Sequence, residues 1–172
     1  LESHADADGI YASNNIKIGN DFSGKITSTA AGDASGMWAE GSIYIDGNVS
    51  GTIAATTTGP DSDSVAYGLY ASNRIDIDGD FSGKITVKGI NYNDVYGMSA
   101  DEGDVSMNNF TGTIEAISAC CAYGIYASDD IRINNFSGSI TSKLNGYPDH
   151  DLDAYGLYAN DSIYIDGDFT GS

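Results

Sequence analysis

Apolar residues alternate with polar ones over short stretches of this chain, and the same stretches return at intervals. Isoleucine pairs separated by one residue occur at 16 and 18, 43 and 45, 75 and 77, 131 and 133, and 163 and 165, and Val105 and Met107 take their place once. A period of two is typical of β-strands, whereas an amphipathic helix requires a period of three to four. The pattern therefore predicts short strands throughout the chain.

Each pair belongs to a longer repeat that begins with glycine. The repeat reads Gly, an aliphatic residue, usually an aromatic residue, Ala, a polar turn, Ile-x-Ile, a second turn and Phe-Ser-Gly-x-Ile. Its six starting glycines are Gly9, Gly36, Gly68, Gly97, Gly124 and Gly156, with spacings of 27, 32, 29, 27 and 32 residues. A recurring unit that cannot bury its apolar face alone is typical of a solenoid, in which stacked copies share one core.

The repeat predicts three strands per copy. The variation in length lies between the last Ile of one copy and the next starting glycine, where residues 59–65 and 146–153 fall, and we expect a surface loop there. We predict an all-β, single-stranded right-handed parallel β-helix, or β-solenoid, of about six coils with three short strands each. Residues 1–172 form one segment of six tandem repeats, and because the last copy stops before its expected Ile, we expect both ends to be cuts in a longer rod.

Three apolar columns are expected to fill the interior, since equivalent residues of successive coils stack about 4.8 Å apart. The first column is formed by the Ile-x-Ile pairs. The second contains Phe22, Val49, Phe81, Phe110, Phe136 and Phe169. The third contains Ile10, Met37, Leu69, Met98, Ile125 and Leu157.

Composition narrows the class of function. The formal charge of −18, from 25 acidic and 7 basic residues, disfavours binding to nucleic acid or to anionic membrane surfaces. The sequence contains neither a signal peptide nor an apolar run long enough to cross a bilayer. His4 and His150 show no metal or triad spacing, and we expect both in solvated loops.

Function in such a scaffold must lie on outward columns or in loops, because the inward columns are used for packing. One outward column is aromatic and is broken only by Ser99; it contains Tyr11, Trp38, Tyr70, Tyr126 and Tyr158. Exposed rings of this kind can stack on sugar rings or on a partner protein. The alternative is a cross-rung ladder that only stabilises the sheet. Tyr67, Tyr96, Tyr123 and Tyr155 present the same choice.

The second turn offers oxygen ligands. Asp46, Asp78 and Asp166 follow the Ile-x-Ile strand, and Asp80 and Asp168 come two residues after the last two of these. Stacked carboxylates repel each other unless cations intervene, so calcium is one hypothesis for these five aspartates. The alternative is turn chemistry, because Asp, Asn and Gly interchange between copies and all three tolerate tight turns.

Two further activities are disfavoured. A flat hydroxyl array on the third strand would suggest ice binding, but Lys25, Lys84 and Glu115 interrupt it. Cleavage of acidic polysaccharides by a β-helix needs carboxylates and basic residues gathered in one cleft, which would break the repeat locally. The coils are near copies and the basic residues do not converge on one of them, so we predict that the protein is not an enzyme.

The only cysteines, Cys120 and Cys121, are adjacent. They are too few for a disulfide framework and their spacing is not that of a zinc motif. A reactive thiol needs an activating cation or histidine, and none is close in sequence. We expect an inert pair or a vicinal disulfide.

The copies Ala-Tyr-Gly-Leu-Tyr-Ala at 66–71 and 154–159, together with Ile-Asp-Gly-Asp-Phe-(Ser/Thr)-Gly, resemble the tandem repeats of bacterial autotransporter passengers. The resemblance covers essentially the whole chain. It implies a β-helix exported across the outer membrane and displayed on the bacterial cell surface, with adhesion to a host or neighbouring cell, a glycan or a matrix protein as its role. The alternative is a passive stalk or a filament that associates with copies of itself.

Overall fold

The computed structural model describes residues 5–59, 64–90, 93–145 and 152–172, which contain seventeen strands arranged in three parallel sheets. The first sheet contains β1 (Ala7–Ala12), β4 (Ala34–Ala39), β7 (Val65–Ala71), β10 (Asp94–Ala100), β13 (Ala122–Ala127) and β16 (Ala154–Ala159). The second contains β2 (Ile16–Ile18), β5 (Ile43–Ile45), β8 (Ile75–Ile77), β11 (Val105–Phe110), β14 (Ile131–Phe136) and β17 (Ile163–Ile165). The third contains β3 (Lys25–Ala30), β6 (Thr52–Thr57), β9 (Lys84–Gly89), β12 (Thr113–Ser118) and β15 (Ser139–Leu144).

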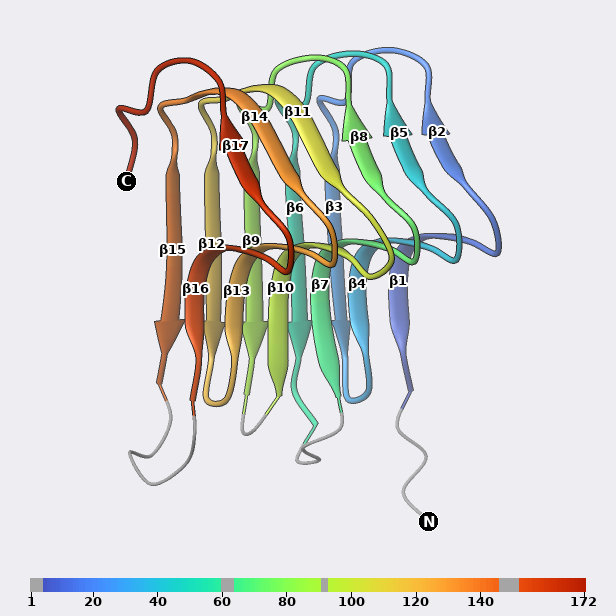
Figure 1. The fold of residues 1–172 in the computed structure, drawn as a ribbon. Helices are drawn as coiled ribbons and strands as arrows, with labels where there is room; N and C mark the ends of the chain where they lie inside the picture. The colour runs from blue at the N-terminus through green and yellow to red at the C-terminus, as the bar shows by residue number, and fades with distance from the viewer. Residues whose placement is uncertain (1–4, 60–63, 91–92, 146–151) are drawn as a thin grey trace.

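Three consecutive strands make one coil, and every strand pairs in parallel with its counterpart in the next coil. The predicted parallel β-solenoid is confirmed, with five coils of three strands followed by β16 and β17. Figure 1 shows the coils stacked side by side as a rod, with the first and last described coils at opposite ends. Among the described residues, no helix is long and apolar enough to span a membrane.

The predicted apolar columns are in register. Ile16 pairs with Ile43, Ile43 with Ile75, and Ile75 with Val105. The second apolar residue of each pair is in register in the same way, so the second sheet presents two apolar residues per coil to the interior. Isolated bridges extend the phenylalanine column from Phe22 to Phe110 and from Phe136 to Phe169, and the pairing of Phe110 with Phe136 joins the two parts. Apart from Phe169, which is exposed, these side chains belong to or pack against a single hydrophobic core.

The starting glycines are required by close packing. A Cβ added at Gly36 would lie 2.5 Å from the carbonyl oxygen of Gly68 and would overlap the Ile53 side chain of the third sheet. Gly68, Gly97 and Gly124 meet the next glycine and an isoleucine in the same way. Only hydrogen fits where the first sheet approaches the third, which explains why each of these copies begins with glycine.

The predicted variable loop is shorter than the sequence suggested. The third strand of each coil continues past its isoleucine, so β3 ends at Ala30, β6 at Thr57 and β12 at Ser118. Val65, placed in the loop by sequence, begins β7. Ala30, Thr57 and Ser118 are buried because their strand positions face the core. Residues 60–63 and 146–151, the central parts of the two long loops, lie outside the described residues, as does each histidine, His4 and His150.

Candidate functional site

The aromatic residues of the first sheet form two neighbouring columns on one face. The predicted column is in register, since Tyr11 pairs with Trp38, Trp38 with Tyr70, and Tyr126 with Tyr158. The second column contains Tyr67, Tyr96, Tyr123 and Tyr155, which pair in the same order. Both columns lie on the outer face, because the side chain between them, for example Leu69, is fully buried in the core.

Strict alternation would place Tyr67 and Tyr70 on opposite faces of the sheet, since they are three residues apart. The glycine between them changes the phase. A Cβ at Gly68 would point toward the Ile85 side chain of the core, and the next residue, Leu69, also points inward. Two consecutive inward positions bring Tyr67 and Tyr70 to the same face, with ring centroids 4.8 Å apart.

Rings within a column are stacked, and rings in different columns meet edge to face. Trp38 and Tyr70 stack at 3.9 Å, and Tyr126 and Tyr158 stack at 5.6 Å with planes 5° apart. Tyr96 meets Tyr126 at 5.8 Å with planes 78° apart. Such pairs each contribute about 0.5–1.5 kcal/mol beyond burial. The aromatic residues of successive coils therefore form the stabilising ladder that the sequence offered as one alternative. A ligand could bind only where a ring face of this ladder is left uncovered.

The gap at Ser99 uncovers one face of the ladder. Ser99 occupies the column position between Tyr70 and Tyr126 and is itself buried. Its hydroxyl lies 3.1 Å from Asp101 Oδ1, and the Tyr70 hydroxyl donates to Asp101 Oδ2 at 2.9 Å. Asp101, the first residue after β10, occupies the turn position that Ser72 and Glu40 hold in the preceding coils and places a carboxylate next to the missing ring. The extra residue of this turn is Glu102. Tyr126 keeps a stacked neighbour, Tyr158, on its other side.

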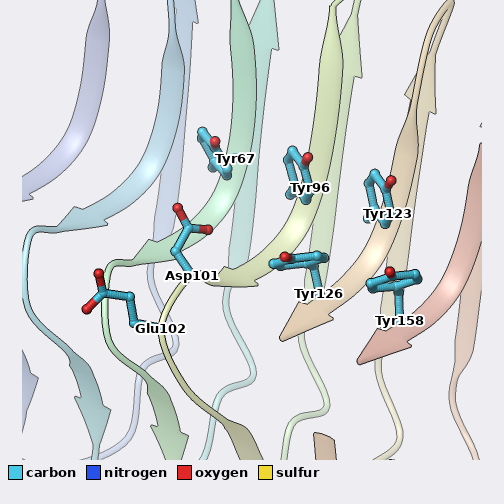
Figure 2. A pocket seen from close by; sticks show the side chains of 7 residues that line it. All are labelled: Tyr67, Tyr96, Asp101, Glu102, Tyr123, Tyr126 and Tyr158. Atoms are coloured by element: carbon cyan, nitrogen blue, oxygen red, sulfur yellow. The ribbon is translucent and has the colours of Figure 1, made fainter. Parts of the chain in front are cut away.

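A groove of about 600 Å³ opens at this gap. Its lining residues are Tyr67, Tyr96, Tyr123, Tyr126, Tyr158, Asp101 and Glu102. Figure 2 shows Tyr67, Tyr96 and Tyr123 in one row, Tyr126 and Tyr158 in a second row turned against the first, and the two acidic side chains at the end of the second row. The floor is therefore aromatic and one end is anionic.

Three of the groove tyrosines, Tyr67, Tyr96 and Tyr123, have raised pKa values. Burial raises the pKa of Tyr67 and of Tyr96, and nearby tyrosines and carboxylates raise both further. Burial likewise raises the pKa of Tyr123 to about 12. Their hydroxyls can therefore donate hydrogen bonds, while Asp101 and Glu102, both exposed, can accept them. The arrangement is suited to a ring-shaped ligand with polar substituents.

The five residues of the predicted aromatic column do not line one common groove. Tyr126 and Tyr158 line the groove. Tyr11 and Trp38 line a smaller groove of about 220 Å³ near the other end of the rod. Tyr70 was expected to face outward, but it is only 9% exposed, because Trp38 stacks on it and its hydroxyl is bonded to Asp101. Sequence reasoning missed Asp101 and Glu102, whose only signal was the extra residue in the fourth copy.

The aspartates proposed as calcium ligands are distributed over the second turns of three different coils, after β5, β8 and β17. Asp46 and Asp78 occupy neighbouring coils, and Lys17 Nζ lies 3.1 Å from Asp46 Oδ2. Asp166 lines a shallow pocket of about 320 Å³ that also includes Asp78. Among the described residues, none of the five aspartates belongs to a cluster of three potential metal ligands. Calcium binding here stays a prediction, which titration calorimetry after chelation would test.

The same turns form a hydrogen-bonded ladder of Asn and Asp side chains. Asn48 Oδ1 accepts from the Asp80 backbone, and Asp80 Oδ1 accepts from the Asn109 amide at 2.7 Å. Asn109 Oδ1 accepts in turn from Asn135, and Asn135 Oδ1 from the Asp168 backbone at 2.9 Å. The ladder gives a structural reason for Asp and Asn to recur at these turns, because either side chain supplies the acceptor.

The hydroxyl face of the third sheet has the predicted register. Lys25 pairs with Thr52, Thr52 with Lys84, and Lys84 with Thr113. The two lysines are exposed. Long charged side chains thus stand between the hydroxyls, as expected from the sequence.

Cys120 and Cys121 are reduced in the structure, half-buried, and separated by 3.8 Å between their sulfur atoms. Burial, followed by the contact with Cys121 and the charge of Asp94, raises the pKa of the Cys120 thiol to about 12. The carboxylate of Asp94, from the neighbouring coil, lies close to both thiols.

No protein-family model, curated protein sequence or solved structure matches this chain.

Proposed function

We propose that this chain is a non-catalytic segment of an extracellular bacterial surface adhesin, of the autotransporter-passenger type, whose aromatic groove binds a glycan. The observation that carries the proposal is the groove at Ser99, which Tyr126 lines together with the acidic side chains of Asp101 and Glu102 at one end. The resemblance of the repeats to autotransporter passengers supports display on the cell surface.

A sugar fits the chemistry of this groove. The apolar face of a pyranose ring stacks on a tyrosine ring, and its hydroxyls can donate to the carboxylates at the open end. Aromatic walls with a few placed polar groups are typical of small-molecule sites. Because the chain has a net charge of −18 and the groove carries two acidic side chains, the ligand should be a neutral or amino sugar. Uronic and sialic acids would be repelled.

A glycan array that contains neutral, amino and acidic sugars tests the proposal, with extracellular-matrix proteins added as a second panel. We expect binding to neutral or amino glycans. Tyr126→Ala should weaken it by about 2 kcal/mol, or roughly 30-fold in Kd, as for a central aromatic contact. The matched control is Tyr164→Ala, which removes an exposed tyrosine of β17 outside the groove and should leave Kd unchanged. Binding to acidic glycans alone, or equal losses in both variants, would contradict the proposal.

A further inference from the structure

Cys120 and Cys121 lie in the turn between β12 and β13, and Asp94 begins β10 in the preceding coil. Val95 pairs with Ala122, and the backbone N–H of Val95 donates to the carbonyl of Cys121 at 2.9 Å. This pairing places Asp94 beside Cys121 across one rung of the first sheet. Residues 26 and 27 positions apart in the sequence thus share one surface site.

Buried hydrogen bonds hold the turn against the neighbouring coil. The Ser118 hydroxyl accepts from the backbone N–H of Cys120 at 2.8 Å and donates to the carbonyl of Asn93. Ser118 and Asn93 are both fully buried. The cysteine turn and the segment that carries Asp94 are therefore fixed to each other through Ser118, so the three side chains are positioned before any ligand binds.

The spacing of the three groups is that of a metal site. The two sulfur atoms are 3.8 Å apart, and the two sulfurs and a carboxylate oxygen of Asp94 all lie within 4.8 Å of one another. A tetrahedral zinc ion with Zn–S bonds of about 2.3 Å holds two sulfurs about 3.8 Å apart, the edge of that tetrahedron. A disulfide would require about 2.05 Å.

We propose that Asp94, Cys120 and Cys121 bind one divalent cation that prefers sulfur ligands, such as Zn²⁺. A water molecule would occupy the fourth coordination position. Sulfur ligands select zinc-like and cadmium-like ions over Ca²⁺ and Mg²⁺, which prefer oxygen. On binding, each thiol releases a proton to solvent, two metal–sulfur bonds and one metal–oxygen bond form, and no atom changes oxidation state. The cation replaces two protons beside an existing carboxylate, which leaves the site with a net charge of −1.

The proposal is independent of glycan binding, because it rests on other residues and its test uses no sugar. Reduced protein is titrated with Cd²⁺, and the thiolate-to-metal charge-transfer absorption is recorded. We expect a band that saturates at one Cd²⁺ per chain, that Zn²⁺ removes and that excess Ca²⁺ does not. Bound metal should also protect both thiols from a thiol-specific reagent.

Single variants separate the three ligands. Cys120→Ser and Cys121→Ser should each abolish the saturating band, and Asp94→Asn should raise the Kd for Cd²⁺ by roughly tenfold or more, since even outer-shell partners of a metal are worth that much. Asp129→Asn, which removes an exposed carboxylate outside both the metal cluster and the groove, is the matched control and should bind Cd²⁺ as the parent does. Circular dichroism checks that each variant keeps its β structure.

Several results would overturn the proposal. They are the absence of a band in folded, reduced protein, an unchanged Kd in Asp94→Asn, a band that survives in Cys121→Ser, and one metal shared by two chains. The last would assign the thiols to a contact between copies.

Discussion

Replacement of Phe110 by alanine tests the stacked core most directly. Phe110 is fully buried, and its ring lies between Phe81 at 5.3 Å and Phe136 at 4.9 Å, with planes 2° and 16° from parallel. The matched control is Phe169→Ala, at the same position of the repeat. Phe169 is 59% exposed and stacks on Phe136 alone, at 5.0 Å.

The expected magnitude follows from the area removed from water. A phenylalanine buries at least about 150 Å², which at about 25 cal/mol per Å² is worth roughly 4 kcal/mol. This agrees with the usual range of about 3–5 kcal/mol for Phe→Ala in a core. Phe169 has less than half of that burial and one ring contact where Phe110 has two, so its loss should cost about 1.5 kcal/mol by the same area coefficient.

Urea denaturation followed by far-UV circular dichroism measures the difference, with the free energy of unfolding extrapolated to water for the parent and both variants. We expect Phe110→Ala to lower it by about 4 kcal/mol. The reasoning is refuted if the two substitutions cost the same, or if Phe110→Ala costs less than about 1 kcal/mol. Either result would mean that equivalent residues do not stack in one continuous interior.

Three further outcomes are expected. Gly36→Ala should destabilise the rod by more than about 1 kcal/mol in thermal melts. Gly156→Ala should be tolerated, because its added Cβ would lie 3.8 Å from its nearest neighbour, the Ile140 side chain. Asn109→Ala should cost about 1 kcal/mol in urea melts through the lost ladder bonds; no change would argue against the ladder. The pKa of Tyr123 is raised to about 12 in the folded protein. Its contribution to the free energy of unfolding is therefore fully present below the unfolded-state pKa of about 10 and is lost as the pH rises toward about 12. Phenolate absorbance should accordingly show this class of tyrosine ionising late, and full titration by pH 10 would refute that.

The sequence by itself determined the coil. Its period of two identified the strands, its recurring glycines identified the repeat, and its isoleucine and phenylalanine columns identified the interior, because each of these signals is local to one copy and is repeated in the next. The interchange of Asp, Asn and Gly between copies left both calcium binding and turn geometry open for the second turn, and the structure adds the hydrogen bonds that run between these side chains.

Only the tertiary structure brought together the residues of the two proposed sites. The phase change at Gly68 joins Tyr67 and Tyr70 on one face, the turn after β10 aims Asp101 at the gap left by Ser99, and Asp94 meets the cysteine pair from another coil. The physical reason is that a site forms between neighbouring coils, whose residues lie about 27 to 32 positions apart in the chain. A local pattern fixes which way a side chain points within its strand, but the register of the stacked coils fixes what it meets.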